Sequence, residues 1–180
     1  EALHLLESDG LITIQAHKGA VVRKLSRQDF SEFFQLRSLF ESFAAGRCAK
    51  RIDEPGVREA FLPLYQEAQA IAAGSERRPF SEHDADMHDT ILRMCNNQML
   101  IEHLRRISLV PLFRYRFLSS IKPADLRQSA AEHVDILGAI LAGSEAQAEA
   151  ASRAHVARIN GIVQSIDAAT FDQLFHFRKG

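Results

Sequence analysis

The chain has 180 residues, 46% of them hydrophobic, and a formal net charge of −1 at pH 7. This length and composition predict one medium domain, or one domain with a fragment of another, and exclude a disordered chain, while the near-zero charge neither favours nor excludes nucleic-acid binding. Cys48 and Cys95 are too few for a disulfide framework and are expected as buried thiols in a reducing cytoplasm; no apolar run reaches the ~20 residues of a membrane span.

The first 25 residues predict a helix end followed by a β-hairpin. Residues 1–9 carry a helical apolar pattern that stops at Gly10. The string LITIQAHKGAVV then places apolar residues on both sides of a His-Lys-Gly turn, with Gly19 where a positive φ is needed. Because Glu1 lies in the middle of a helical pattern, we expect an upstream portion that this sequence lacks.

The rest of the chain predicts helices only. Ser26, with Asp29 three residues later, resembles a capping box and opens a helix that extends to about Lys50. Apolar periodicity and breaker residues predict further helices at about 57–73, 80–97, 98–119 with a break near Pro111, 123–142 and 144–165, and a short tail helix near 171–176. The expected fold is all-α, an antiparallel bundle of six or seven helices preceded by the hairpin.

The stretch HDADMHDTIL, residues 83–92, places Asp84 and His88 four residues apart. Side chains at this spacing share one helix face, and here that face also carries Ile91 and Cys95. A carboxylate and an imidazole are therefore directed where apolar side chains point. Taken alone, such a pair is most often a surface ion pair, so it does not identify a site.

Two further histidines are expected to meet across a tight turn at Gly143. His133 lies ten residues before this glycine and His155 lies twelve after it, each on the apolar stripe of its helix. Helices joined by a tight turn run antiparallel, and a rise of ~1.5 Å per residue places the two imidazoles roughly 15 and 18 Å from the turn. The difference is less than one helical turn, so the two rings should lie at a similar level.

Three inward histidines and one inward carboxylate together favour a metal site. Each is costly to bury alone, because each must find a partner or stay neutral, whereas one divalent cation satisfies all four. Nitrogen-rich ligation with one carboxylate suits Zn, Ni, Mn or Fe better than Ca or Mg. A buried histidine with a single hydrogen bond remains the ordinary alternative for each of them, so spacing alone leaves the metal site open.

Several strings of the sequence match one known family. EALHLLESDGLITIQAHKGAVVRKLS is similar to the end of a recognition helix and the wing of a winged helix-turn-helix. FFQLRSLFESFAAGRCAKR, DADMHDTILRMCNNQML and EHVDILGAILAGSEAQAEAASRAHV are similar to the first helix, the Asp-x-x-x-His helix and the closing hairpin of an effector domain. Up to about residue 165 the chain resembles GntR-type bacterial transcription regulators of the FadR subfamily, with the metal-binding form of the FCD effector domain. The resemblance implies four metal ligands: Asp84, His88, His133 and His155.

The resemblance also implies two domains and their partners. Residues 1–25 would be the C-terminal remnant of the winged helix-turn-helix DNA-binding domain, and residues 26–180 the helical metal- and effector-binding domain. The regulator would be a cytoplasmic bacterial homodimer that binds operator DNA, responds to a small carboxylate effector and contacts no membrane. Lys18, in the wing, is a predicted phosphate or minor-groove contact, with a solvated turn lysine as the equal alternative.

Three residues are predicted effector contacts. Arg37 lies in the middle of the apolar stripe of the first long helix, where a guanidinium can hold a carboxylate through two parallel hydrogen bonds. An internal ion pair between Arg37 and Glu41, one turn apart, is the open alternative. Asn97 and Arg116 are weaker predictions, with a helix cap and a surface charge as their ordinary interpretations.

A metal-dependent hydrolase is the alternative function. A metal held by one Asp and three His, with open positions and nearby carboxylates on Asp86, Asp89 and Glu132, could activate a water molecule. The hairpin has no role in such an enzyme, and the sequence offers no well-placed general base. We therefore expect a regulator and not an enzyme; a purely structural metal is a third interpretation.

Overall fold

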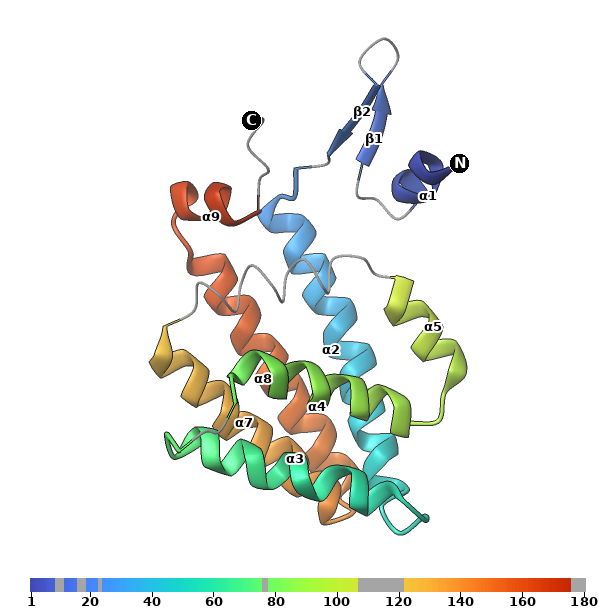
Figure 1. Cartoon of the computed structure of the whole chain (residues 1–180), viewed down its shortest axis with the longest axis vertical. Helices are drawn as coiled ribbons and strands as arrows, with labels where there is room; N and C mark the ends of the chain where they lie inside the picture. Colours follow the sequence, from blue (N-terminus) through green and yellow to red (C-terminus); the bar gives the residue numbers. More distant parts are fainter. Residues whose placement is uncertain (9–11, 16–18, 23, 76–77, 107–121, 176–180) are drawn as a thin grey trace.

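The computed structural model of the chain describes residues 1–8, 12–15, 19–22, 24–75, 78–106 and 122–175. A small hairpin and a short helix stand at one end of a bundle of long helices (Figure 1). Within the described residues seven helices follow the hairpin, which confirms the predicted fold class. In chain order the elements are α1 (Ala2–Ser8), β1 (Ile12–Gln15), β2 (Gly19–Val22), α2 (Arg27–Lys50), α3 (Val57–Ala72), α4 (Phe80–Met94), α5 (Gln98–Arg106), α7 (Pro123–Leu141), α8 (Glu145–Ser165) and α9 (Ala168–Phe175).

The hairpin has the predicted strands. β1 and β2 pair antiparallel, with Ile12 opposite Val22 and Gln15 opposite Gly19. Gly19 has a φ of 76°, the left-handed conformation that the sequence predicts at this position. The turn that contains Lys18 lies outside the described residues.

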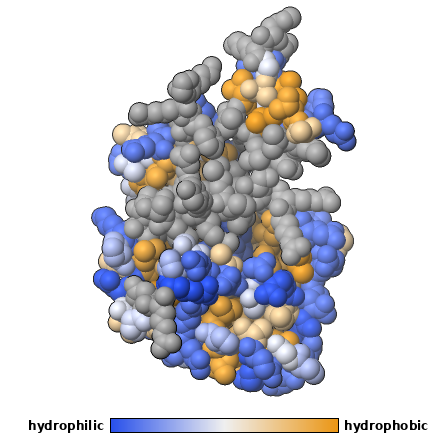
Figure 2. Space-filling view, viewed as in Figure 1, coloured by the Kyte–Doolittle hydropathy of each residue, from blue (hydrophilic) through white to orange (hydrophobic). Residues whose placement is uncertain are grey.

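The surface of the molecule differs between the hairpin end and the bundle. Figure 2 shows hydrophobic side chains gathered at the top of the view, over α1 and the hairpin, where Leu3 and Ile14 are exposed. The bundle below presents a mainly hydrophilic surface in this view, broken by small hydrophobic areas. Within the described residues no helix has both the length and the hydropathy needed to cross a membrane.

α2 begins where the capping box predicts. The backbone N–H of Asp29 donates to Oγ of Ser26 (3.1 Å), and the backbone N–H of Ser26 donates to Oδ2 of Asp29 (2.8 Å). Other predicted ends that fall within the described residues lie close to those in the structure. Ser144 occupies the N-cap position of α8 without a side-chain capping hydrogen bond. The predicted break near Pro111 lies outside the described residues.

α2 and α8 pack against each other through the centre of the bundle (Figure 1). Small side chains allow this close approach, since Ala44, Ala45 and Ala49 of α2 are completely or almost completely buried. A Cβ atom added at Gly46 would lie 2.7 Å from Cγ of Glu149 in α8, so a larger residue there would require the Glu149 side chain to move. The two long helices therefore bring their central residues close together.

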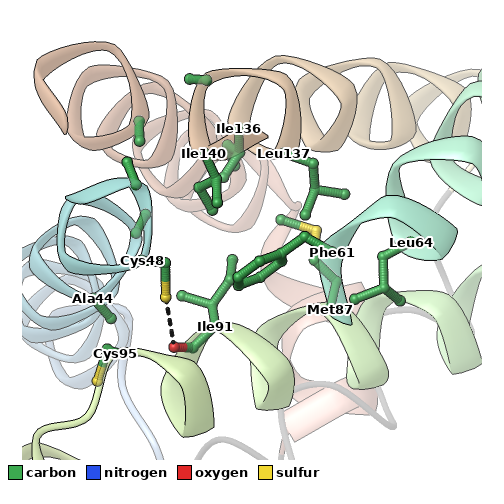
Figure 3. Close-up of a cluster of buried hydrophobic side chains, with 14 of the residues drawn as sticks. Ala44, Cys48, Phe61, Leu64, Met87, Ile91, Cys95, Ile136, Leu137 and Ile140 are labelled. Carbon is green, nitrogen blue, oxygen red and sulfur yellow. Dashed lines mark hydrogen bonds between the residues drawn. The ribbon is translucent and has the colours of Figure 1, made fainter. Parts of the chain in front are cut away.

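The larger hydrophobic cluster fills the end of the bundle away from the hairpin (Figures 1 and 3). Phe61 of α3 and Met87 of α4 are fully buried in it, among apolar side chains of α7. The two cysteines are free and buried, as predicted, and Sγ of Cys48 donates to the carbonyl of Ile91 at 3.2 Å. Burial raises the pKa of the Cys48 thiol, which keeps it protonated and unreactive.

A second hydrophobic cluster joins the start of α2 to the end of α8. Phe30 is its centre, with ring centroids 5.7 Å from Phe171 and 4.5 Å from Phe175, both on α9. The tail of the chain, for which the sequence predicts only a short helix near 171–176, is thus a longer helix that completes this cluster.

A layer of buried polar residues lies between the apolar clusters. On α2, Arg37 and Glu41 come between Phe34 of the second cluster and Ala44 of the larger one; on α8, His155 separates residues of the same two clusters. Four helices contribute to this polar layer: α2, α4, α7 and α8. Because buried polar groups must find partners, this layer is where a binding site is expected.

Candidate metal centre

Three imidazoles from three helices converge in the polar layer. One ring nitrogen from each of His88, His133 and His155 lies within 4.8 Å of the other two. The ring centroids are 4.8 Å apart for His133 and His155, 5.6 Å for His88 and His133, and 5.8 Å for His88 and His155. All three side chains are buried. His133 and His155 thus meet across the turn between α7 and α8, as their spacing in the sequence predicts.

Asp84 brings a carboxylate to the same point. Its Oδ1 lies 3.5 Å from Nε2 of His88 and 3.8 Å from Nε2 of His133, and the residue is 7% exposed. The helical spacing of Asp84 and His88 places both on the buried side of α4, as the sequence predicts. All four predicted ligands are therefore in one cluster.

This set of donors fits a divalent transition metal. In the part of the chain that the structure describes, Nε2 of His88 and both ring nitrogens of His133 are buried without a hydrogen-bond partner. Such groups cost free energy unless something occupies their lone pairs. Bonds of about 2.1 Å to one ion place the ligand atoms roughly 3 to 4 Å apart, close to the separations that Asp84 makes with the two histidines. Imidazole nitrogens with one carboxylate suit Zn, Ni, Mn or Fe.

His88 has an outer ring nitrogen, Nδ1, which is the one that does not face Asp84, and this nitrogen contacts α2. Nδ1 of His88 lies 3.2 Å from Oε2 of Glu41, which accepts hydrogen bonds from Nε (2.7 Å) and Nη2 (3.0 Å) of Arg37. Burial opposes the charge on Glu41, but Arg37 and His88 outweigh it and lower the pKa of that carboxyl. Burial likewise opposes a charge on His88, but Glu41 and Asp84 outweigh it and raise the pKa of the imidazole.

His155 is held in a similar way by α7. Its Nδ1 lies 2.7 Å from Oε2 of Glu132, which also accepts a hydrogen bond from Arg158. Burial lowers the pKa of His155, and burial together with neighbouring His155 lowers the pKa of His133 well below its usual value. Both rings are therefore neutral near pH 7, which is the form that binds metals.

One buried histidine in this region was not predicted. His83 is completely buried, its Nδ1 lies 3.0 Å from Oε2 of Glu67, and its ring centroid lies 5.3 Å from that of His133. Its position could have been found from the sequence, because Phe80, His83 and Met87 have the i, i+3, i+7 spacing of one helix face.

Two of the three predicted effector residues, Arg37 and Asn97, have other partners in the structure. Arg37 makes the ion pair with Glu41 that the sequence left as the alternative, and both residues are buried. Asn97 caps α5, where its Oδ1 accepts a hydrogen bond from the backbone N–H of Leu100 at 3.1 Å. Arg116 lies outside the described residues, as does Lys18.

The carboxylates that the hydrolase interpretation requires are all engaged by cations. Asp86 accepts a hydrogen bond from Nη1 of Arg78 (2.7 Å), and Asp89 accepts one from Nε of Arg93 (2.7 Å). Glu132, described above, faces His155 and an arginine.

Comparison with known proteins identifies the family. Residues 32–158 match the FCD domain. The Nta operon transcriptional regulator of Aminobacter aminovorans is 27% identical over 182 residues, which cover 100% of this chain and 78% of that protein. The HTH-type transcriptional repressor RspR of Escherichia coli (strain K12) is 28% identical, over 92% of this chain and 72% of that protein.

A solved structure gives the same result for the fold. The GntR family regulator from Pseudomonas syringae pv. tomato superposes with a TM-score of 0.56 at 20% identity, over 96% of this chain and 69% of that one. Together with the FCD match and the named relatives, this likeness agrees with the arrangement of helices and hairpin described above. The chain belongs to the FCD domain family of GntR-type, FadR-like transcription regulators.

Proposed function

We propose that this chain senses a small carboxylate through a divalent transition metal held by Asp84, His88, His133 and His155, and that this binding alters the affinity of the regulator for its operator. The observation that carries the proposal is the convergence of three buried imidazole nitrogens within 4.8 Å of one another, with a buried carboxylate beside them. Four side chains from three helices meet there with nitrogen atoms that lack partners among the described residues.

The residues around the cluster prepare it for a metal. Glu41 and Glu132 each face the outer nitrogen of one histidine, which fixes the orientation of that ring and increases its basicity toward a metal. When bound, a metal that prefers five or six ligands supplies one or two open positions for carboxylate oxygens of an effector. The chain's own contribution is to hold the four ligands rigidly in a buried, low-dielectric layer.

Arg37 is proposed as the second anchor of the effector. The residue is 5% exposed, and its guanidinium already donates to Glu41 through Nε and Nη2. An effector carboxylate must therefore share this guanidinium with Glu41 or displace Glu41. Either event changes the carboxylate that faces His88. Asn97, at the start of α5, stays a weaker prediction.

The response would pass from the helical domain to the DNA-binding domain. In this proposal residues 1–25 belong to the winged helix-turn-helix and residues 26–180 to the sensing domain, which pairs with a second copy so that two DNA-binding domains meet two half-sites. An effector shifts operator binding only if its affinity differs between the two arrangements of the dimer. Lys18, in the wing, would contact the phosphate backbone.

A gel-shift titration with metal analysis tests the proposal. The regulator, with this chain behind a complete winged helix-turn-helix, is loaded with Zn²⁺ or stripped with a chelator and titrated against operator DNA with lactate, succinate or gluconate. We expect stoichiometric metal and a change in operator affinity with at least one class of acid, only in the loaded protein. A protein that binds its operator but never retains metal would contradict the sensor. Turnover of an ester or amide substrate without DNA binding would instead support the hydrolase.

A further inference from the structure

His83 is a buried histidine outside the proposed ligand set. It is completely buried, and its Nδ1 lies 3.0 Å from Oε2 of Glu67 on α3. Glu67 accepts hydrogen bonds from both Nε and Nη2 of Arg78, so the carboxylate is fixed from the opposite side. Nε2 of His83 is buried and, among the described residues, has no hydrogen-bond partner.

The other nitrogen that needs a partner belongs to His133. Nε2 of His133 is the nitrogen that faces Asp84, at 3.8 Å, and is therefore the one available to a metal. Nδ1 of His133 would then have to carry a proton, because a neutral imidazole has one N–H. This N–H is buried and, in the described part of the chain, has no acceptor, unlike the outer nitrogens of His88 and His155, which face Glu41 and Glu132.

Nε2 of His83 and Nδ1 of His133 can take complementary roles, one as acceptor and the other as donor of a hydrogen bond. If Nδ1–H of His83 donates to Glu67, Nε2 of His83 is a lone-pair acceptor, which is the partner that Nδ1–H of His133 lacks. A hydrogen bond of about 2.9 Å between two imidazole edges places the ring centroids roughly 5 Å apart, and those of His83 and His133 are 5.3 Å apart. The two nitrogens are not hydrogen-bonded to each other in this structure, so the rings must turn for the bond to form. Phe80 stacks on His133 with centroids 5.4 Å apart and limits how far this ring can turn.

We propose that His83 is a positioning residue, which accepts a hydrogen bond from His133 and, with Glu67 and Arg78 behind it, orients His133 toward the metal. This inference rests on the proposed metal site. In this arrangement the outer nitrogen of each of the three histidine ligands is linked to a carboxylate. Glu41 serves His88, Glu132 serves His155, and Glu67 serves His133 through His83. An outer partner of this kind fixes both the tautomer and the direction of a ligand.

The test compares two replacements of His83 by metal affinity and by tautomer. His83→Phe keeps a ring of similar size but removes both hydrogen bonds, whereas His83→Gln can still accept from His133 and donate to Glu67. His103→Phe is the matched control, since His103 is exposed on α5 and its Nδ1 contacts the carbonyl of Met99 in its own helix. The 180-residue chain is titrated with Zn²⁺ against a chromophoric chelator, and ¹H–¹⁵N spectra of its histidine rings are recorded with and without Zn²⁺.

We expect His83→Phe to weaken Zn²⁺ affinity by about 10- to 100-fold, with His83→Gln between this variant and the wild type and His103→Phe equal to the wild type. In the zinc-loaded wild type, His83 and His133 should both be Nδ1–H tautomers. Of these two rings only His133 should show a metal-induced ¹⁵N shift, and it should be on Nε2. Wild-type affinity in His83→Phe, or a metal shift on His83 itself, would overturn the positioning role and leave the metal site standing. Failure of the wild type to bind any of Zn²⁺, Ni²⁺, Mn²⁺ or Fe²⁺ would remove the proposed function and this inference with it.

Discussion

Glu41 of α2 and His88 of α4 meet with Oε2 of the carboxylate 3.2 Å from Nδ1 of the imidazole. The same carboxylate accepts two hydrogen bonds from Arg37, so one buried side chain joins the proposed effector anchor to a proposed metal ligand. A competing carboxylate at Arg37 therefore changes the surroundings of His88 without touching it.

Removal of one imidazole should abolish metal binding and effector response together. In His88→Ala or His133→Ala three protein ligands remain, and the cluster loses one of its three buried imidazoles. We expect loss of bound metal by elemental analysis and loss of calorimetric heat with the acid that the wild type binds. His103→Ala is the control; full metal content and unchanged effector affinity in both site variants would refute the shared site.

Metal removal should lower the melting temperature. A ligand present at 100 times its Kd stabilises the folded state by about 2.7 kcal/mol, and 1 kcal/mol shifts the Tm of a chain of this size by roughly 2 to 4 °C. We therefore expect chelation to lower the Tm by about 5 to 10 °C in differential scanning calorimetry. The shift should be absent in His133→Ala, and a Tm that is insensitive to every transition metal would contradict the prediction.

The sequence could predict most of the fold because the decisive patterns are local. The capping box at Ser26 and Asp29 sets the start of α2, and the tight turn near Gly143 makes α7 and α8 antiparallel, which is enough to bring His133 to His155. These inferences need only helical periodicity and the rise per residue.

Other features depend on contacts between elements that sequence spacing does not encode. The partner of His83 is Glu67, sixteen residues away on another helix, and nothing local links them. The attachment of α9 to the start of α2 likewise depends on how Phe171 packs against Phe30. The ion pair of Arg37 with Glu41 is local, but the sequence could not decide between this pair and an effector carboxylate bound by Arg37, because either partner satisfies the same guanidinium.

Arg37 and Glu41 should be strongly coupled in their contributions to the free energy of unfolding. Glu41→Leu leaves a buried guanidinium without its carboxylate, and we expect a loss of about 3 to 5 kcal/mol in the free energy of unfolding. Arg37→Met with Glu41→Leu removes both charges and should recover most of that loss. Urea unfolding of the two single variants and the double variant measures the coupling; simple addition of the two single losses would show that the pair is not coupled.

Glu67 should make stability depend on pH in mild acid. Hydrogen bonds from Arg78, and then from His83, lower the pKa of Glu67 below its usual 4.5, in spite of partial burial. The resulting stability is fully present above that pH and is lost as the pH falls through the lowered value. We expect Glu67→Gln to reduce the change in unfolding free energy between about pH 5 and pH 3, as measured by urea titration. Glu59→Gln, exposed on the same helix, is the matched control, and an unchanged slope in Glu67→Gln would contradict the assignment.

The tail helix should be required for stability. Phe171 is 4% exposed and packs on Phe30, so Phe171→Ala should cost about 3 to 5 kcal/mol of unfolding free energy. Leu62→Ala, at a position 45% exposed on α3, should change it by less than about 0.5 kcal/mol. Equal effects of the two substitutions in chemical denaturation would show that α9 is not docked as described.

Arg27, the first residue of α2, binds the C-terminal end of α8, the helix that carries His155. Its Nη1 donates to the carbonyls of Val163 (3.1 Å) and Gln164 (2.9 Å), and its guanidinium lies 4.5 Å from the ring centroid of Phe171. The residues just before Arg27 lead directly to the hairpin. Arg27 therefore ties the C-terminal end of α8 to the segment of the chain that leads to the hairpin.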